Sequence, residues 1–141
     1  MGKSGQYIHR NVINVNVEFN DTYDENRVIE VSLNQANDQT AGALLFNRPY
    51  FSGNIQLIRL TGTVAGGASG IILKAYEDSS GTKLLLPPSL ASFESAVTGT
   101  NKGVVFFVNA YHEGASDKLY IFCKTDTGTF TCSQVQIAWY E

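Results

Sequence analysis

Apolar and polar side chains alternate strictly in residues 13–19, which read INVNVEF. Successive side chains of an extended strand point to opposite faces, so every second residue of this run would share one face. That face would carry Ile13, Val15, Val17 and Phe19, while the asparagines and the glutamate would meet water. The segment therefore predicts a strand with one buried and one solvated side.

The same alternation predicts further strands, separated by turn residues, along the rest of the chain. They cover residues 29–33, 55–64, 71–77, 104–112, 118–124 and 129–140. Within 55–64 the apolar phase changes after Leu57, which predicts a β-bulge. We expect Gly66–Gly70 to join two of these strands as a hairpin and Thr125–Gly128 to join the last two as another.

One short helix is expected near residues 89–98. Pro87 and Pro88 are predicted to end extended structure, and Ser89 could cap a helix that follows them. Leu90, Phe93 and Val97 then recur at helical spacing.

These elements predict an all-β chain, a two-sheet antiparallel β-sandwich of jelly-roll type, with that one helix. An immunoglobulin-like sandwich is disfavoured because its Cys, Trp, Cys spacing is missing. The 141 residues suit one domain, assigned to 7–141, preceded by a polar, flexible arm at 1–6 that a neighbour would order. We expect no signal peptide and no membrane-spanning segment, because no apolar run is long enough.

Charge narrows the classes of partner. The chain has ten basic and 13 acidic residues, for a net charge of −3. It therefore lacks the excess of positive charge that is typical of proteins that bind nucleic acid or an anionic membrane. The glycines at 66–70 precede a strand instead of a helix, which argues against a phosphate-binding loop. We therefore expect neither partner and no nucleotide cofactor.

Residues for catalysis or metal binding are few. His9 and His112 are the two histidines, and Glu113, Ser116 and Asp117 follow the second closely. Neighbours along one turn rarely converge as a catalytic triad, so a solvated hairpin end is the preferred interpretation. Residues 20–26 carry many oxygen ligands but lack the EF-hand spacing, so plain turn chemistry is preferred there too. We predict no catalytic residue, no cofactor and no metal.

Two cysteines, Cys123 and Cys132, flank the predicted turn at 125–128. A cross-strand disulfide and a pair of buried free thiols are both compatible with this spacing. Buried thiols are preferred, because free cysteine behaves as a small apolar residue.

Aromatic residues are numerous for one small core, with 7 Tyr, 8 Phe and 1 Trp. Arg48, Tyr50 and Phe51 lie together in a predicted loop and are of the types enriched at interface hot spots, although Phe51 could equally close one end of the sandwich. Tyr120, Phe122, Trp139 and Tyr140 lie on the last two strands, where alternation must turn some rings outward. The interface candidates are thus Arg48, Tyr50, Phe51, Tyr120 and Tyr140, and outward rings could form a platform for sugar.

The whole pattern resembles the small all-β virion proteins of tailed bacteriophages, of the capsid decoration or cement type. The resemblance rests on the polar arm 1–6, the Asn-, Thr- and Gly-rich turns, the LLLPPS segment at 84–89 and the closing 118–140 pair. It implies a non-enzymatic protein that binds the outer capsid lattice as a homotrimer. Its partners would be itself and the major capsid protein, and its location the capsid surface after synthesis in the host cytoplasm.

A second hypothesis comes from another functional class. Jelly rolls also present aromatic platforms to sugars, so the chain could be a carbohydrate- or receptor-binding module of a phage fibre or a secreted enzyme. An enzyme is the third and least favoured hypothesis.

Overall fold

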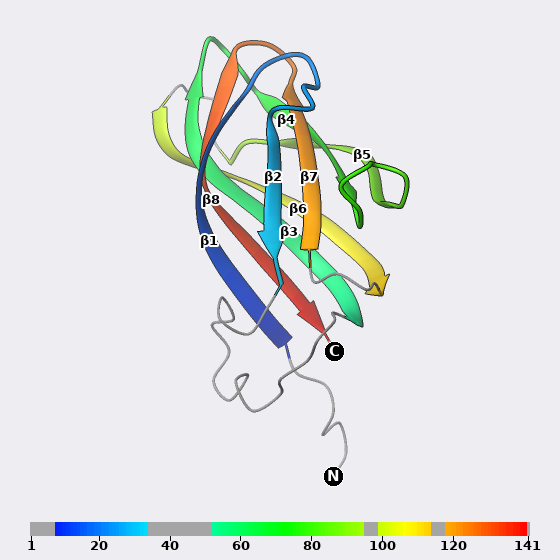
Figure 1. Ribbon diagram of the computed structural model, residues 1–141. Helices are drawn as coiled ribbons and strands as arrows, with labels where there is room; N and C mark the ends of the chain where they lie inside the picture. Colours follow the sequence, from blue (N-terminus) through cyan, green and yellow to red (C-terminus); the bar gives the residue numbers. More distant parts are fainter. Residues whose placement is uncertain (1–7, 34–51, 95–98, 114–117, 141) are drawn as a thin grey trace.

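The computed structural model describes residues 8–33, 52–94, 99–113 and 118–140, which form eight strands (Figure 1). The strands are β1 (Ile8–Phe19), β2 (Val28–Ser32), β3 (Ser52–Ala65), β4 (Gly70–Tyr76), β5 (Leu84–Ser92), β6 (Gly99–Glu113), β7 (Lys118–Thr125) and β8 (Thr129–Tyr140). The predicted arm at 1–6 lies outside the described residues. Each strand predicted from alternation is present, and β5 is an additional one.

The strands form two four-stranded antiparallel sheets packed face to face. Sheet A has the order β1-β8-β3-β6 and sheet B the order β2-β7-β4-β5. The first strand thus pairs with the last, the second with the seventh, the third with the sixth and the fourth with the fifth. This nested pairing is the jelly-roll arrangement of a β-sandwich, as the sequence predicted.

Two predicted hairpins are wrong, because the strands on either side of each turn belong to different sheets. β3 lies in sheet A and β4 in sheet B, while β7 lies in sheet B and β8 in sheet A. Both connections cross at the same end of the sandwich, at the top of Figure 1. Gly66 and Gly128 have φ of 70° and 64°, and a Cβ on Gly128 would lie 2.3 Å from the carbonyl oxygen of Ala65. The two crossings therefore pack backbone against backbone, which needs glycine on both sides.

Asp126 holds the two crossings together. Its carboxylate accepts hydrogen bonds from the backbone nitrogen of Ser69 at 3.1 Å, from the Ser69 hydroxyl at 2.5 Å and from the backbone nitrogen of Gly70 at 3.4 Å. These hydrogen bonds, with the Ser69 hydroxyl first, lower the pKa of Asp126 to about 2. A charged acceptor thus joins two loops that are far apart in sequence.

The predicted bulge in β3 is confirmed. The register of β3 shifts between Ile55 and Leu57 against both β6 and β8. As a result Ile55 and Ile58 both face the core with no exposure, although they are three residues apart. On the paired strand β6, Asn109 adopts a φ of 47° beside this irregularity. The bulge lets one long strand keep its apolar face inward along its whole length.

The helix predicted near 89–98 is wrong where the structure describes this segment. Residues 84–92 form β5, and residues 95–98 lie outside the described residues. β5 is at the edge of sheet B, where a proline removes no ladder hydrogen bond that a central strand would need. The register with β4 is irregular where Pro87 and Pro88 stand, between Leu73 and Ala75. The described ranges contain no helix long and apolar enough to cross a membrane.

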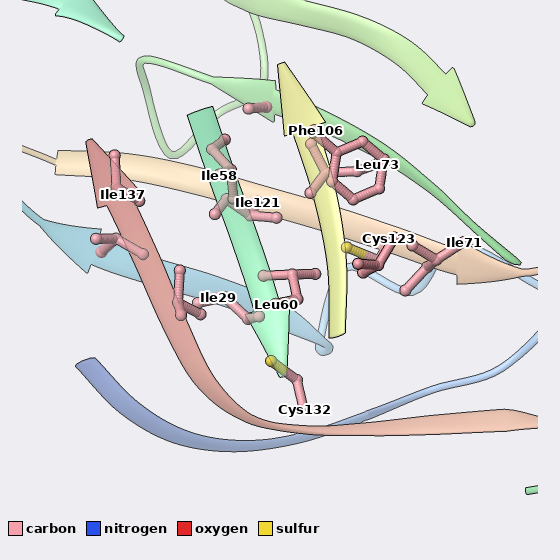
Figure 2. Packing of buried hydrophobic residues seen from close by; sticks show 14 of the residues in the cluster. Ile29, Ile58, Leu60, Ile71, Leu73, Phe106, Ile121, Cys123, Cys132 and Ile137 are labelled. Carbon is pink, nitrogen blue, oxygen red and sulfur yellow. The ribbon is translucent and has the colours of Figure 1, made fainter. Parts of the chain in front are cut away.

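The core lies between the two sheets (Figure 2). Ile58, Leu60 and Ile137 extend from sheet A, and Ile71, Leu73 and Ile121 extend from sheet B; all six are fully buried. The ring of Phe93, just after β5, packs on Phe130 at 5.0 Å between centroids. Each fully buried side chain of this size contributes roughly 1.5–3 kcal/mol of transfer free energy, which makes the sandwich interior the main source of stability.

Candidate functional site

The outer face of sheet B carries a groove with an aromatic floor. Strand alternation turns Tyr120 and Phe122 of β7 outward, together with Lys74 and Tyr76 of β4. The register places Lys74 opposite Phe122 and Tyr76 opposite Tyr120. The rings of Tyr76 and Phe122 meet edge to face, with centroids 5.7 Å apart. Neighbouring strands thus gather three rings that the sequence scatters over 47 positions.

Two loops form the walls of this groove. The β1–β2 loop contributes Tyr23, and its turn is held by a hydrogen bond from the Asn26 backbone nitrogen to Asp24 Oδ1 at 2.8 Å. The β4–β5 loop contributes Ser79 to Gly81. Between them the groove has a volume of about 750 Å³, which is large enough for two or three sugar rings or a short peptide.

Asp78 shapes the second wall. It accepts hydrogen bonds from the hydroxyl groups of Thr82 and Ser80 and from the backbone nitrogen of Lys83. These bonds, led by the Thr82 hydroxyl, hold the pKa of Asp78 well below its usual range. The loop therefore keeps a defined shape as long as this carboxylate is ionised.

Two lysines lie over the tyrosine of the first wall. Lys74 Nζ is 4.2 Å from the centroid of the Tyr23 ring, 5.7 Å from that of Tyr76 and 5.8 Å from that of Phe122. Lys124 Nζ is 4.9 Å from the Tyr23 ring. The attraction between an ammonium group and a ring face holds both lysine side chains next to Tyr23.

The charges around the groove are unevenly matched. Glu30 on β2 pairs with Lys118 at 2.5 Å. Within the part of the chain that the structure describes, Lys74 and Lys124 form no ion pair with a carboxylate. Glu25 lines the groove from the β1–β2 loop and is exposed. Lys74 and Lys124 therefore present positive charge beside aromatic rings, with no ion pair to a carboxylate among the described residues.

The Tyr23 hydroxyl is buried and accepts or donates no hydrogen bond among the described residues. Burial, then the nearby Cys123 and Tyr76, raises the pKa of Tyr23. The phenol therefore stays neutral well above physiological pH.

The outer face of sheet A carries a second, more apolar surface. Phe107 of β6 is 83% exposed and pairs in register with Leu57 of β3, which pairs with Ala138 of β8. Arg10 and Arg59 border this row, within a shallow depression of about 530 Å³. A phenylalanine this exposed on a flat sheet is of the kind that anchors protein interfaces.

The predicted cluster around His112 is not a solvated hairpin end. His112 is fully buried, and its Nδ1 contacts Oε1 of Glu77, which follows β4. This contact joins β6 of sheet A to sheet B across the end of the sandwich. Ser116 and Asp117 lie outside the described residues. Glu77 lies 35 positions away from His112 in the sequence, so spacing along the chain does not reveal this contact.

The two cysteines are free and buried, which confirms the preferred prediction of buried thiols over a cross-strand disulfide. Cys123 is in sheet B and Cys132 in sheet A, so no common hairpin brings them together. Burial raises the pKa of Cys132 to about 11 and that of Cys123 well above its usual value, with the neighbouring Cys132 as a further cause for Cys123. Both act as core residues, and the described residues contain no group of three or more potential metal ligands.

Of the five predicted interface residues, the structure places Tyr120 in the groove. Arg48, Tyr50 and Phe51 lie outside the described residues. Tyr140 ends β8, where its backbone pairs with Ile8, and its side chain is not among those described. Trp139, considered as an outward ring, is buried at 4% exposure.

Sequence reasoning missed Tyr23, Lys74 and Tyr76. The alternation in 70–76 places Lys74 and Tyr76 on one face, so that pair could have been found. Tyr23 could not, because a loop residue carries no periodic signal. In comparison with known proteins, no protein-family profile and no curated protein matches this sequence.

Proposed function

We propose that this chain is a non-enzymatic virion structural protein that binds the outer surface of a phage capsid as a homotrimer. Its partners are further copies of itself and the major capsid protein. It is made in the host cytoplasm and resides on the capsid surface.

The observation that carries this proposal is the apolar row Phe107, Leu57 and Ala138 on the outer face of sheet A. An aromatic side chain buries roughly 150–250 Å² at an interface. Covering the exposed 83% of Phe107 at about 25 cal/mol per Å² contributes on the order of 3–5 kcal/mol. A neighbouring protein surface recovers this free energy, and water does not.

The geometry of a lattice makes such modest contacts sufficient. A protein that binds many equivalent sites through several copies gains avidity far beyond one contact. Arg10 and Arg59 at the edge of the row supply the polar groups that commonly surround an apolar interface centre. Arg48, Tyr50 and Phe51 stay predicted contacts of the same assembly.

Light scattering of the purified full chain at micromolar concentration tests this proposal. We expect a mass near three chains, and a mass near one chain for Phe107→Ser. Leu90→Ser is the matched control, because Leu90 is also exposed, at 70%, but lies on the edge strand of the other sheet. An unchanged mass in Phe107→Ser would contradict the role of sheet A, and a native monomer that also fails to sediment with purified capsids would contradict the function.

A second candidate function is carbohydrate binding, which the groove on sheet B favours. Three outward rings, two serines of the β4–β5 loop and Lys74 line one open site. Ring faces pack against the C–H faces of sugars, while hydroxyl and ammonium groups satisfy their hydroxyls. Binding to a glycan array that is lost in Phe122→Ala would support this candidate.

A further inference from the structure

We propose that the groove on sheet B binds an acidic saccharide, whose carboxylate is received by Lys74, with the ammonium group of Lys124 beside the same Tyr23 ring. This inference rests on the carbohydrate-binding candidate above and names the class of sugar. It is carried by the position of two ammonium groups that contact rings and no carboxylate among the described residues.

Positive charge lies at one end of the groove, on Lys74 and Lys124. Glu30 is neutralised by Lys118 at 2.5 Å, so it does not cancel the lysines across the groove. Glu25 lies on the exposed β1–β2 loop, and the carboxylate of Asp78 accepts hydrogen bonds within the β4–β5 loop. The groove as a whole is thus close to neutral, and its positive charge gathers at Lys74 and Lys124 beside the Tyr23 ring. Attraction for a small anion is therefore local to the lysine end of the groove and does not extend to a polyanion such as nucleic acid.

Aromatic rings orient the ammonium groups of Lys74 and Lys124. The Nζ atom of Lys74 lies within 6 Å of three ring centroids, and that of Lys124 within 5 Å of one. Ring contacts orient an ammonium without using up its hydrogen-bond donors on an acceptor atom. A ligand carboxylate can then bind with little further loss of side-chain freedom.

The aromatic floor of the groove lies next to Lys74 and suits a stacked sugar ring. Tyr120, Phe122 and Tyr76 line the floor next to Lys74, so a ring that stacks there brings its substituents close to the ammonium. Ser79 on the far wall offers a hydroxyl to the ring hydroxyls. A carboxylated pyranose satisfies both the aromatic floor and the charged side, whereas a neutral sugar satisfies only the floor.

The test uses the full chain and two matched ligand pairs in titration calorimetry. The pairs are sialyllactose with lactose, and oligogalacturonate with its methyl ester. We expect the acidic member of at least one pair to bind about tenfold more tightly than its neutral partner, because a hydrogen bond to a charged group is the stronger kind. Added salt should reduce this preference and leave the neutral affinity unchanged.

Variants then assign the preference to residues. Lys74→Met should reduce acidic binding to the neutral level, Lys74→Arg should retain most of it, and Glu25→Gln should strengthen it. Lys102→Met, on sheet A, is the matched control and should change nothing. Melting temperature and circular dichroism of each variant show whether the fold is intact.

The outcomes distinguish failure of the acidic-sugar inference from failure of the carbohydrate-binding function. Equal affinity for acidic and neutral members, or a preference that survives Lys74→Met in a folded variant, would overturn the acidic-sugar inference while leaving sugar binding in place. No binding of any of these ligands or of any glycan on an array would overturn the carbohydrate function itself. An acidic preference lost in Lys74→Met and kept in Lys74→Arg would establish the inference.

Discussion

Asp126 offers the sharpest test of how this sandwich is held together. Its carboxylate lies on the β7–β8 crossing and accepts three hydrogen bonds from Ser69 and Gly70 on the β3–β4 crossing. Asp126→Asn keeps the shape of the side chain but removes its charge. Asp126→Ala removes every hydrogen bond at once. We expect both to destabilise the fold, the alanine variant more strongly.

The magnitude follows from the pKa of Asp126. The fall from 3.8 to about 2 corresponds to roughly 2.4 kcal/mol of preference for the ionised form in the folded state. Asp126 is exposed, and solvent screening reduces such a figure, so we expect about 1 kcal/mol for Asp126→Asn and about 2 kcal/mol for Asp126→Ala.

The same values fix the pH dependence. The pKa is lower in the folded than in the unfolded chain, so the stabilisation is fully present above pH 4 and is lost as the pH falls through about 2. The free-energy difference between the native chain and Asp126→Asn should therefore be constant near neutrality and approach zero at pH 2. Asp78 also titrates in acid, but it does so in both proteins and cancels in the difference.

Urea denaturation followed by tryptophan fluorescence, at pH 7, 4, 3 and 2, measures these differences. Asp21→Asn is the control, because Asp21 is an exposed aspartate that accepts no hydrogen bond among the described residues. A difference for Asp126→Asn that matches the control at pH 7, or that persists unchanged at pH 2, would refute the reasoning.

Three other predictions concern the core. Gly62→Ala should destabilise the fold by several kcal/mol or prevent folding, because its Cβ would lie 2.0 Å from a carbonyl oxygen of β8. Soluble expression and the melting temperature measure this effect. A variant that melts like the native chain would contradict the close approach of the two strands. Cys123 and Cys132 should resist a thiol reagent at pH 8 in the native state and both react in denaturant, since burial keeps them protonated. Leu73→Ala should cost about 2–5 kcal/mol in urea denaturation, whereas Leu90→Ala, at an exposed position, should cost less than about 0.5 kcal/mol.

The strands themselves were predictable because alternation reports which side chains face inward. Residues 13–19 and 55–64 show this well, since even the bulge near Leu57 was visible as a change of phase. Alternation also places Tyr120 and Phe122 on one face of β7, and hence in the floor of the groove. These features depend on residues close together in the chain.

Sequence reasoning failed where an element depends on its neighbours in space. The spacing of Leu90 and Phe93 fits a helix, but the backbone of this segment pairs with β4 as an edge strand that tolerates two prolines. His112 looked like a turn residue, yet it is buried against Glu77 from the other sheet. In both cases tertiary contacts outweigh the local pattern.

The sequence alone determined that this chain is built mainly of β-strands, where seven of its eight described strands lie, and which aliphatic side chains of these strands face inward. Only the tertiary structure decided which strands pair, because a period of two marks the inward face of a strand and carries no information about its neighbour. For that reason the turns at Gly66 and Gly128 were recognised, while their role as crossings between sheets was not. The groove has the same origin: Tyr23, Lys74 and Phe122 meet because a loop and two paired strands bring them together across about 100 residues of chain.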